Sequence, residues 1–251
     1  MHRFANPARF LRMSAVVLPW SAAAAGLLIL AGLYFALFAS PPDYQQGESV
    51  RIMYVHVPAA WMALFVYSVM AGASAVALVW KHPLAHIAAK ASAPIGACFT
   101  AVALITGSLW GKPMWGTWWV WDARLTSVLI LFFLYIGHIA LTNAFEDSSR
   151  GERAAAILAL VGFVNIPIIK YSVDWWSTLH QPASVIRMGG PTIDSAMLVP
   201  LFLMGVGFTA YFVAVLILRM RGELLARKIR VLRMARVQGE SMIHAAAGGA
   251  G

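Results

Sequence analysis

The chain has 251 residues, of which 61% are hydrophobic and only 12% are charged, whereas a soluble domain averages about 45–50% apolar and about 25% charged residues. So little charge cannot cover a soluble globule of this size, and the composition therefore predicts an integral membrane protein. The net charge of +9 does not indicate nucleic-acid binding. Seven of the 19 cations follow the last apolar stretch, which is typical of a tail beside anionic lipid.

Six apolar stretches follow one another, and each is long enough to cross a bilayer as a helix of about 20 residues. They cover residues 16–39, 57–80, 92–111, 125–145, 153–172 and 195–218. The first stretch lacks a clean cleavage site and is expected to stay as a helix. We predict an all-α membrane protein with one six-helix domain over 1–218. A basic tail follows over 219–251, continuing the sixth helix or lying on the membrane, and its end (245–251) is expected to be disordered.

The distribution of Lys and Arg predicts the orientation of the chain. Fourteen of these residues lie at the N-terminus, in or beside the second and fourth gaps, and in the tail, and the other five lie in or beside the other three gaps. Cations accumulate on the cytoplasmic side of membrane proteins, so both termini are expected to be cytoplasmic. The gaps at 40–56, 112–124 and 173–194 then face the external side.

The third gap and the end of the apolar stretch before it contain five of the ten tryptophans within twelve residues. They are Trp110, Trp115, Trp118, Trp119 and Trp121. An aromatic belt at the membrane interface explains one or two tryptophans at a helix end, but five are more than a belt needs. The cluster therefore predicts an aromatic shelf for a large, flat, apolar ligand.

Two histidines flank this cluster from the other external gaps. His56 ends the first of these gaps and His180 lies in the last, and each has a tryptophan within five residues. Imidazole binds iron axially, and a porphyrin needs flat apolar contacts. We therefore predict a non-covalent haem b with His56 and His180 as axial iron ligands.

Polar residues on the same side complete the predicted site. The haem propionates need cations, and Arg51, Arg124 and Arg187 are the candidates. Asp122 follows the last tryptophan of the cluster. It is expected either to pair with Arg124 or to accept a hydrogen bond from a tryptophan indole.

The remaining candidates are weaker. His82 and His86 are four residues apart in a cytoplasmic gap and share a helix face, but no acidic residue or cysteine is adjacent in sequence. His138 lies within the fourth span, where we expect a neutral ring hydrogen-bonded to a threonine or a carbonyl. Cys98 is the single cysteine, and we expect it to be a small core residue.

The run Trp115-Gly116-x-x-Trp119-x-Trp121-Asp122 resembles the W-G-x-x-W-x-W-D (WWD) signature of the haem-handling membrane proteins of cytochrome c biogenesis. Six spans and one external histidine on each side of the signature resemble the CcmC family, haem exporter protein C. The resemblance covers residues from about 15 to about 220, and these positions show no departure from the family's pattern.

The resemblance implies that His56 and His180 are the axial haem ligands. It also implies that the Trp-rich segment 110–127 contacts haem and the periplasmic haem chaperone CcmE. Members of the family act with the ATPase CcmA, the membrane subunit CcmB and the small CcmD in the bacterial inner membrane. On this basis the chain is expected to present haem at the periplasmic face and not to be an enzyme.

Two other interpretations remain open. The chain has no P-loop motif, and as a structural subunit of an ABC-type export complex it would bind no cofactor and use the tryptophans and tail for docking. A small-solute permease is the third interpretation, although the spans hold few ionisable groups from which to build a polar pathway.

Overall fold

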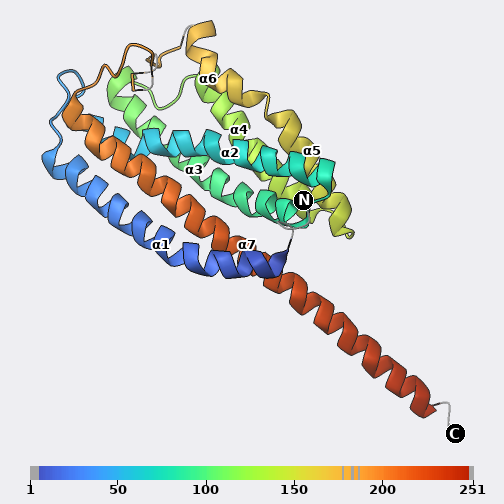
Figure 1. Ribbon diagram of the computed structural model, residues 1–251. Helices are drawn as coiled ribbons and strands as arrows, with labels where there is room; N and C mark the ends of the chain where they lie inside the picture. Colours follow the sequence, from blue (N-terminus) through green and yellow to red (C-terminus); the bar gives the residue numbers. More distant parts are fainter. Residues whose placement is uncertain (1–5, 177, 182–183, 186, 249–251) are drawn as a thin grey trace.

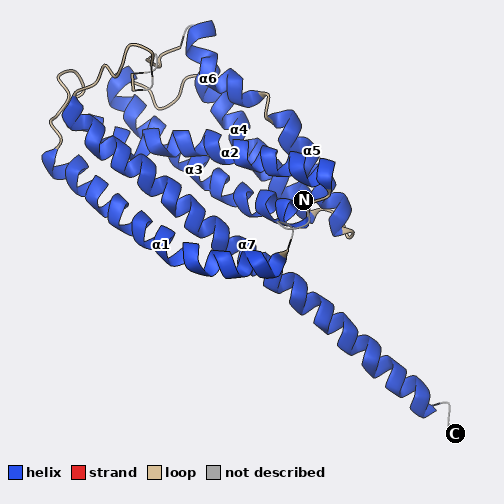
Figure 2. Cartoon of the chain, in the orientation of Figure 1, coloured by secondary structure: helices blue, strands red, loops and turns tan. Residues whose placement is uncertain are grey.

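The computed structural model describes residues 6–248 except 177, 182–183 and 186, and for 237–248 it describes the backbone only. These residues are nearly all helical and form no strand (Figure 2). Six helical stretches are long and apolar enough to cross a membrane, which confirms the predicted fold class. The elements in order are α1 (Pro7–Tyr34), η2 (Phe35–Ala39), η3 (Glu48–Ile52), α2 (Met53–Trp80), α3 (Pro83–Trp115), α4 (Ala123–Asn143), α5 (Ser148–Gly162), α6 (Asn165–Trp175) and α7 (Ser195–Gly248).

The helices pack as neighbouring pairs. Helix α1 lies along α7, α2 along α3 and α4 along α5 (Figure 1). Only two residues join α2 to α3, and Lys81 makes this tight turn with a φ of 49°. The start of α2 and the end of α3 therefore meet at one end of the bundle, here called the site end. The start of α3 and the end of α4 lie at the opposite end.

The core is built where α2, α3 and α4 cross. Tyr135 of α4 is fully buried, and its hydroxyl donates a 2.7 Å hydrogen bond to the carbonyl of Ala63. Gly96 of α3 makes room for this ring, because a Cβ there would lie 2.1 Å from Tyr135 Cζ. Cys98, expected in the core, is exposed. It lies on α3 between the buried Ala97 and Phe99, and its own side chain reaches the surface of the bundle.

The fifth predicted span is not one continuous helix. It is broken at Phe163 and Val164, and α6 begins at Asn165. Pro167 in the first turn of α6 lacks the N–H that a continuous helix would need at that point. The Asn165 side chain donates a 2.8 Å hydrogen bond to the carbonyl of Ser127, which ties α6 to α4.

The sixth helix is much longer than its apolar stretch. Helix α7 continues through the basic tail and leaves the bundle (Figure 1), so of the two alternatives the tail continues the helix. The backbone is helical as far as Gly248, which agrees with the high helix propensity of the three alanines before it. The expected disorder at the end of the tail stays a prediction. Residues 249–251 lie outside the described part of the chain.

Candidate haem site

The end of α3 supplies the frame of the candidate site. The helix stops at Gly116, which has a φ of 75° and donates its N–H to the carbonyl of Lys112. This left-handed residue turns the chain into a short irregular segment that reaches the start of α4. Trp110 and Trp115 lie in the last turns of α3 and face the two predicted histidine ligands.

His56 lies inside a helix and does not end a loop, because α2 begins at Met53. Its ring centroid is 5.7 Å from that of Trp110, in an edge-to-face arrangement. His56 Nδ1 is 3.1 Å from Thr106 Oγ1. The ring also lies close to the α3 backbone, since a Cβ on Gly107 would be 3.0 Å from His56 Cε1.

The hydrogen bonds around Thr106 determine which nitrogen of His56 carries the proton. The Thr106 hydroxyl donates to the carbonyl of Val102 over 2.6 Å, so its oxygen is left to accept. His56 Nδ1 must then be the donor, and Nε2 keeps its lone pair. An Nε2 lone pair is what an axial iron ligand requires.

His180 is held in a similar way by Asp122. One carboxylate oxygen of Asp122 accepts from the Leu125 N–H over 2.7 Å and caps α4, and the other is 3.3 Å from His180 Nδ1. Neither of the two expected partners of Asp122 is therefore the observed one. The Asp122 side chain is only 6% exposed, and its charge favours a protonated Nδ1 and an available Nε2 on His180.

The surroundings of His180 also affect its protonation. Burial lowers the pKa of His180 below its ordinary value, and the Arg124 charge acts in the same direction, while Asp122 opposes both. The ring centroid of Trp115 is 5.0 Å away. His56 packs against Trp110, which like Trp115 lies in the last turns of α3. The two predicted ligands thus lie at the same end of the bundle.

The tryptophans surround the histidines but do not form one flat shelf. Trp119 and Trp121 meet edge to face at 5.5 Å, and Trp121 is 74% exposed. Trp118 is also exposed, and the ammonium of Lys112 lies 5.8 Å from its ring centroid. Trp119 Nε1 is buried and has no hydrogen-bond partner among the described residues.

Two of the three candidate propionate cations have partners within the protein. Arg51 pairs with Glu48 and donates to the carbonyl of Ala36. Arg124 donates to Ser172 Oγ over 3.1 Å and so joins α4 to α6. Arg187 is exposed in the loop before α7. A propionate role for all three stays a prediction.

The sequence-based interpretation missed Thr106 and Gln46, and it did not place Trp110 beside His56. Gln46 Oε1 accepts a 2.9 Å hydrogen bond from Trp110 Nε1 and anchors that ring to the first loop. Thr106 precedes Trp110 by four residues and so shares its helix face. That spacing was the available signal for Thr106, whereas nothing local in the sequence indicates Gln46.

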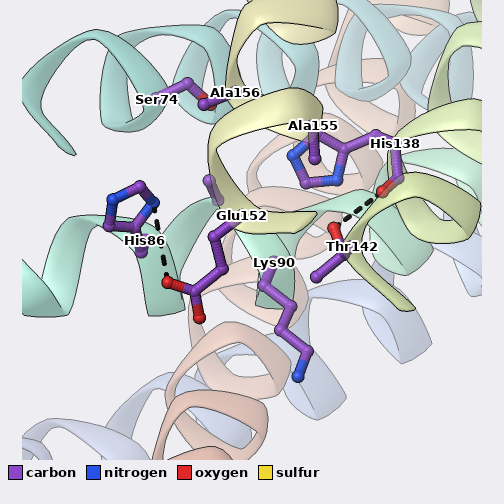
Figure 3. A pocket seen from close by; sticks show the side chains of 9 residues that line it. Ser74, His86, Lys90, His138, Thr142, Glu152, Ala155 and Ala156 are labelled. Atoms are coloured by element: carbon purple, nitrogen blue, oxygen red, sulfur yellow. Dashed lines mark hydrogen bonds and ion pairs between the residues drawn. The ribbon is translucent and has the colours of Figure 1, made fainter. Parts of the chain in front are cut away.

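A second polar cluster lies at the opposite end of the bundle, around a small hollow (Figure 3). His86 Nδ1 is 4.0 Å from Glu152 Oε2, so an acidic residue distant in sequence does lie beside it. Glu152 pairs with Arg227 of α7. Among the described residues no group of three histidines, cysteines or carboxylates lies close enough to hold a metal.

His138 does not have the hydrogen bond that we expected. Its Nδ1 is buried without a partner in the described structure, and the Thr142 hydroxyl donates instead to the His138 backbone carbonyl. Ser74 Oγ is also unpaired and lines the same hollow. The expected partner fails because a threonine four residues on reaches the helix carbonyl more easily than the ring.

Comparison with known proteins gives a consistent result. A family model described as "Heme exporter protein C" (CcmC) matches residues 1–235. The chain is 58% identical to heme exporter protein C of Bradyrhizobium diazoefficiens over 98% of this chain and 93% of that protein. It is 48% identical to heme exporter protein C of Escherichia coli K12 over 92% of this chain and 93% of that protein.

A further relative comes from a plant. The chain is 52% identical, over 70% of its length and 74% of the relative, to a putative cytochrome c biosynthesis ccmC-like mitochondrial protein of Marchantia polymorpha. The family match covers the six membrane-type helices and the whole candidate site. The chain therefore belongs to the CcmC family, described as heme exporter protein C.

Proposed function

We propose that this protein handles haem during c-type cytochrome biogenesis and binds haem b non-covalently at the site end, with His56 and His180 as axial ligands of the iron. The observation that carries the proposal is the matched environment of these rings. In each, Nδ1 faces an oxygen atom and a tryptophan lies beside the ring. Both Nε2 lone pairs are therefore available to iron.

The other residues at this end fit a porphyrin. Indole rings provide rigid apolar area at a low cost in conformational entropy. The buried Trp119 Nε1, which has no partner among the described residues, is an unused donor that suits a propionate oxygen or another acceptor on the ligand. The protein makes no bond to carbon in this scheme. Its residues bind haem, orient the ring and limit the access of water.

The proposal includes a location and a set of partners. The 14-to-5 division of Lys and Arg supports cytoplasmic termini, so the site end faces the periplasm from the bacterial inner membrane. There the exposed Trp118 and Trp121 are available to the chaperone CcmE, which receives the haem. CcmA, CcmB and CcmD are the proposed complex partners, since names of relatives point to haem export and cytochrome c biosynthesis.

An absorption spectrum of protein purified after haem-replete expression tests the proposal. We expect a Soret band in the wild-type protein and its loss in the His56→Ala, His180→Ala double variant. The matched control is the His86→Ala, His138→Ala double variant, which removes two histidines from the opposite end. A colourless wild-type preparation would favour a structural subunit without cofactor. An unchanged Soret band in the first double variant would disprove the ligand assignment.

A further inference from the structure

The partners of the two candidate ligands are not equivalent. His180 Nδ1 faces a carboxylate that is 6% exposed, whereas His56 Nδ1 faces a threonine hydroxyl. A carboxylate partner gives imidazole partial imidazolate character and makes it a stronger electron donor to a metal. A neutral hydroxyl has a much smaller effect, because hydrogen bonds to charged groups are roughly twice as strong.

Both partners are fixed by a second interaction. Asp122 caps α4 through its other carboxylate oxygen, which is 2.7 Å from the Leu125 N–H. Thr106 is held by its donation to the Val102 carbonyl. Neither side chain can rotate away from its histidine without losing a hydrogen bond, so each sets the ring orientation as well as the tautomer.

We propose that Asp122 and Thr106 are positioning residues of unequal strength, and that the bond from His56 to iron is therefore the weaker one and opens first when haem leaves. This inference rests on the proposed function. Release then has a fixed order: haem stays on His180 while the His56 side opens to the acceptor. Asp122, predicted from the sequence to bind the cofactor, acts here through His180 instead.

Haem retention in single-histidine variants tests the order. His56→Gly keeps the Asp122–His180 pair and should retain haem more tightly than His180→Gly, which keeps only the Thr106–His56 pair. Adding Asp122→Asn to His56→Gly should remove this advantage, with a loss of about 10–100-fold in haem affinity, the usual effect of removing such a partner. Equal or reversed retention by the two single variants would overturn the order.

Substitutions of the positioning residues in the two-histidine protein give a second test. Asp122→Asn should raise the reduction potential of the haem, because a weaker donor stabilises the ferric iron less. Thr106→Val should shift the potential less, and Thr106→Ser should restore it. The matched controls are Asp147→Asn, since Asp147 also caps a helix through its carboxylate, and Thr100→Val, since the Thr100 hydroxyl also donates to a carbonyl four residues back. Potentials moved equally by controls and test variants would refute the positioning roles.

Nitrogen-15 NMR of labelled histidines in the haem-free protein gives a readout that needs no haem. We expect both rings to carry the proton on Nδ1. In Asp122→Asn the amide oxygen can keep the cap of α4 while its NH₂ group faces His180, which should move the His180 proton to Nε2. An unchanged His180 tautomer would overturn the role of Asp122. A wild-type protein that takes up no haem would instead overturn the proposed function, and the release order with it.

Discussion

Two pairs of histidines lie at opposite ends of the same bundle and have different surroundings. At the site end, His56 and His180 each have an oxygen beside Nδ1 and an indole beside the ring. At the opposite end, His86 faces a carboxylate at 4.0 Å and the buried Nδ1 of His138 has no partner in the described structure. His86 and Trp110, which mark the two ends on α3, are about 36 Å apart along the helix at the usual rise per residue.

The difference teaches which histidines are fit to bind haem. Burial is common to both ends, and an acidic neighbour is found at both. The site end alone, within the described residues, combines a fixed tautomer with aromatic surface beside each ring. Glu152 at the opposite end is already paired with Arg227, which makes that cluster part of the packing between α5 and α7.

Acidification provides the largest expected effect. A protonated imidazole has no lone pair for iron, so haem should be lost as the pH falls. Because burial lowers the pKa of His180, its neutral form persists to lower pH, and the midpoint of haem loss should lie below the ordinary histidine value of about 6.5. Soret absorbance across a pH titration measures this. Full occupancy down to about pH 4 would show that histidine does not hold the iron.

Removal of Trp119 should have the next largest effect. Trp119→Ala removes a ring and an unpaired buried N–H from the site end, and haem transfer to the chaperone should fall roughly tenfold. Trp80→Ala is the matched control, since Trp80 is a half-exposed tryptophan at the opposite end of α2. Equal transfer by both variants and the wild type would reduce the tryptophan cluster to an interfacial belt.

Crowding His56 should have a smaller effect. A Cβ on Gly107 would lie 3.0 Å from His56 Cε1, so Gly107→Ala should shift the ring by a few tenths of an ångström and lower haem affinity several-fold. A Cβ on Gly72 meets nothing within 4 Å, so Gly72→Ala should leave haem affinity unchanged. Haem titration measures the haem affinity of both variants. Equal affinities would contradict the role of His56 as an iron ligand.

The opposite end should affect stability and leave haem binding unchanged. Glu152→Gln removes the nearer of the two acidic partners of Arg227 and leaves Glu223 at 3.9 Å, so it should lower the free energy of unfolding by about 1–3 kcal/mol. The comparison variant is Glu48→Gln, since Glu48 also pairs with an arginine but is 68% exposed, so its loss should cost under about 1 kcal/mol. Thermal unfolding and the Soret band are measured together. A loss of haem in Glu152→Gln would show that the opposite end also contributes to haem binding.

The sequence predicts the helices better than it predicts the contacts between them. Hydropathy is a local property, so six apolar stretches were enough for the fold class. The break before α6 was visible as Pro167, but the span was still predicted as continuous. Pairing of His180 with Asp122 joins residues 58 apart in the chain, and no periodicity in the loop before α7 indicates it.

The site was predictable in its residue types and less so in their roles. The two histidines and the tryptophans were identified because such residues are unusual together at one membrane face. The role of Asp122 was not identified, although an aspartate directly before an apolar helix is a known capping signal. Its second oxygen could be assigned only after the fold brought His180 to the start of α4.

Helix α7 runs unbroken for 54 residues from Ser195 at the site end, a length of about 81 Å at the usual helical rise. A bilayer's hydrocarbon layer is only about 30 Å thick. The far part of this rod must therefore stand in water and carry its arginines clear of the lipid. These arginines are accessible to a soluble partner that does not enter the membrane, and the same helix joins Tyr54 in one buried cluster at the site end through Met197 and Leu201.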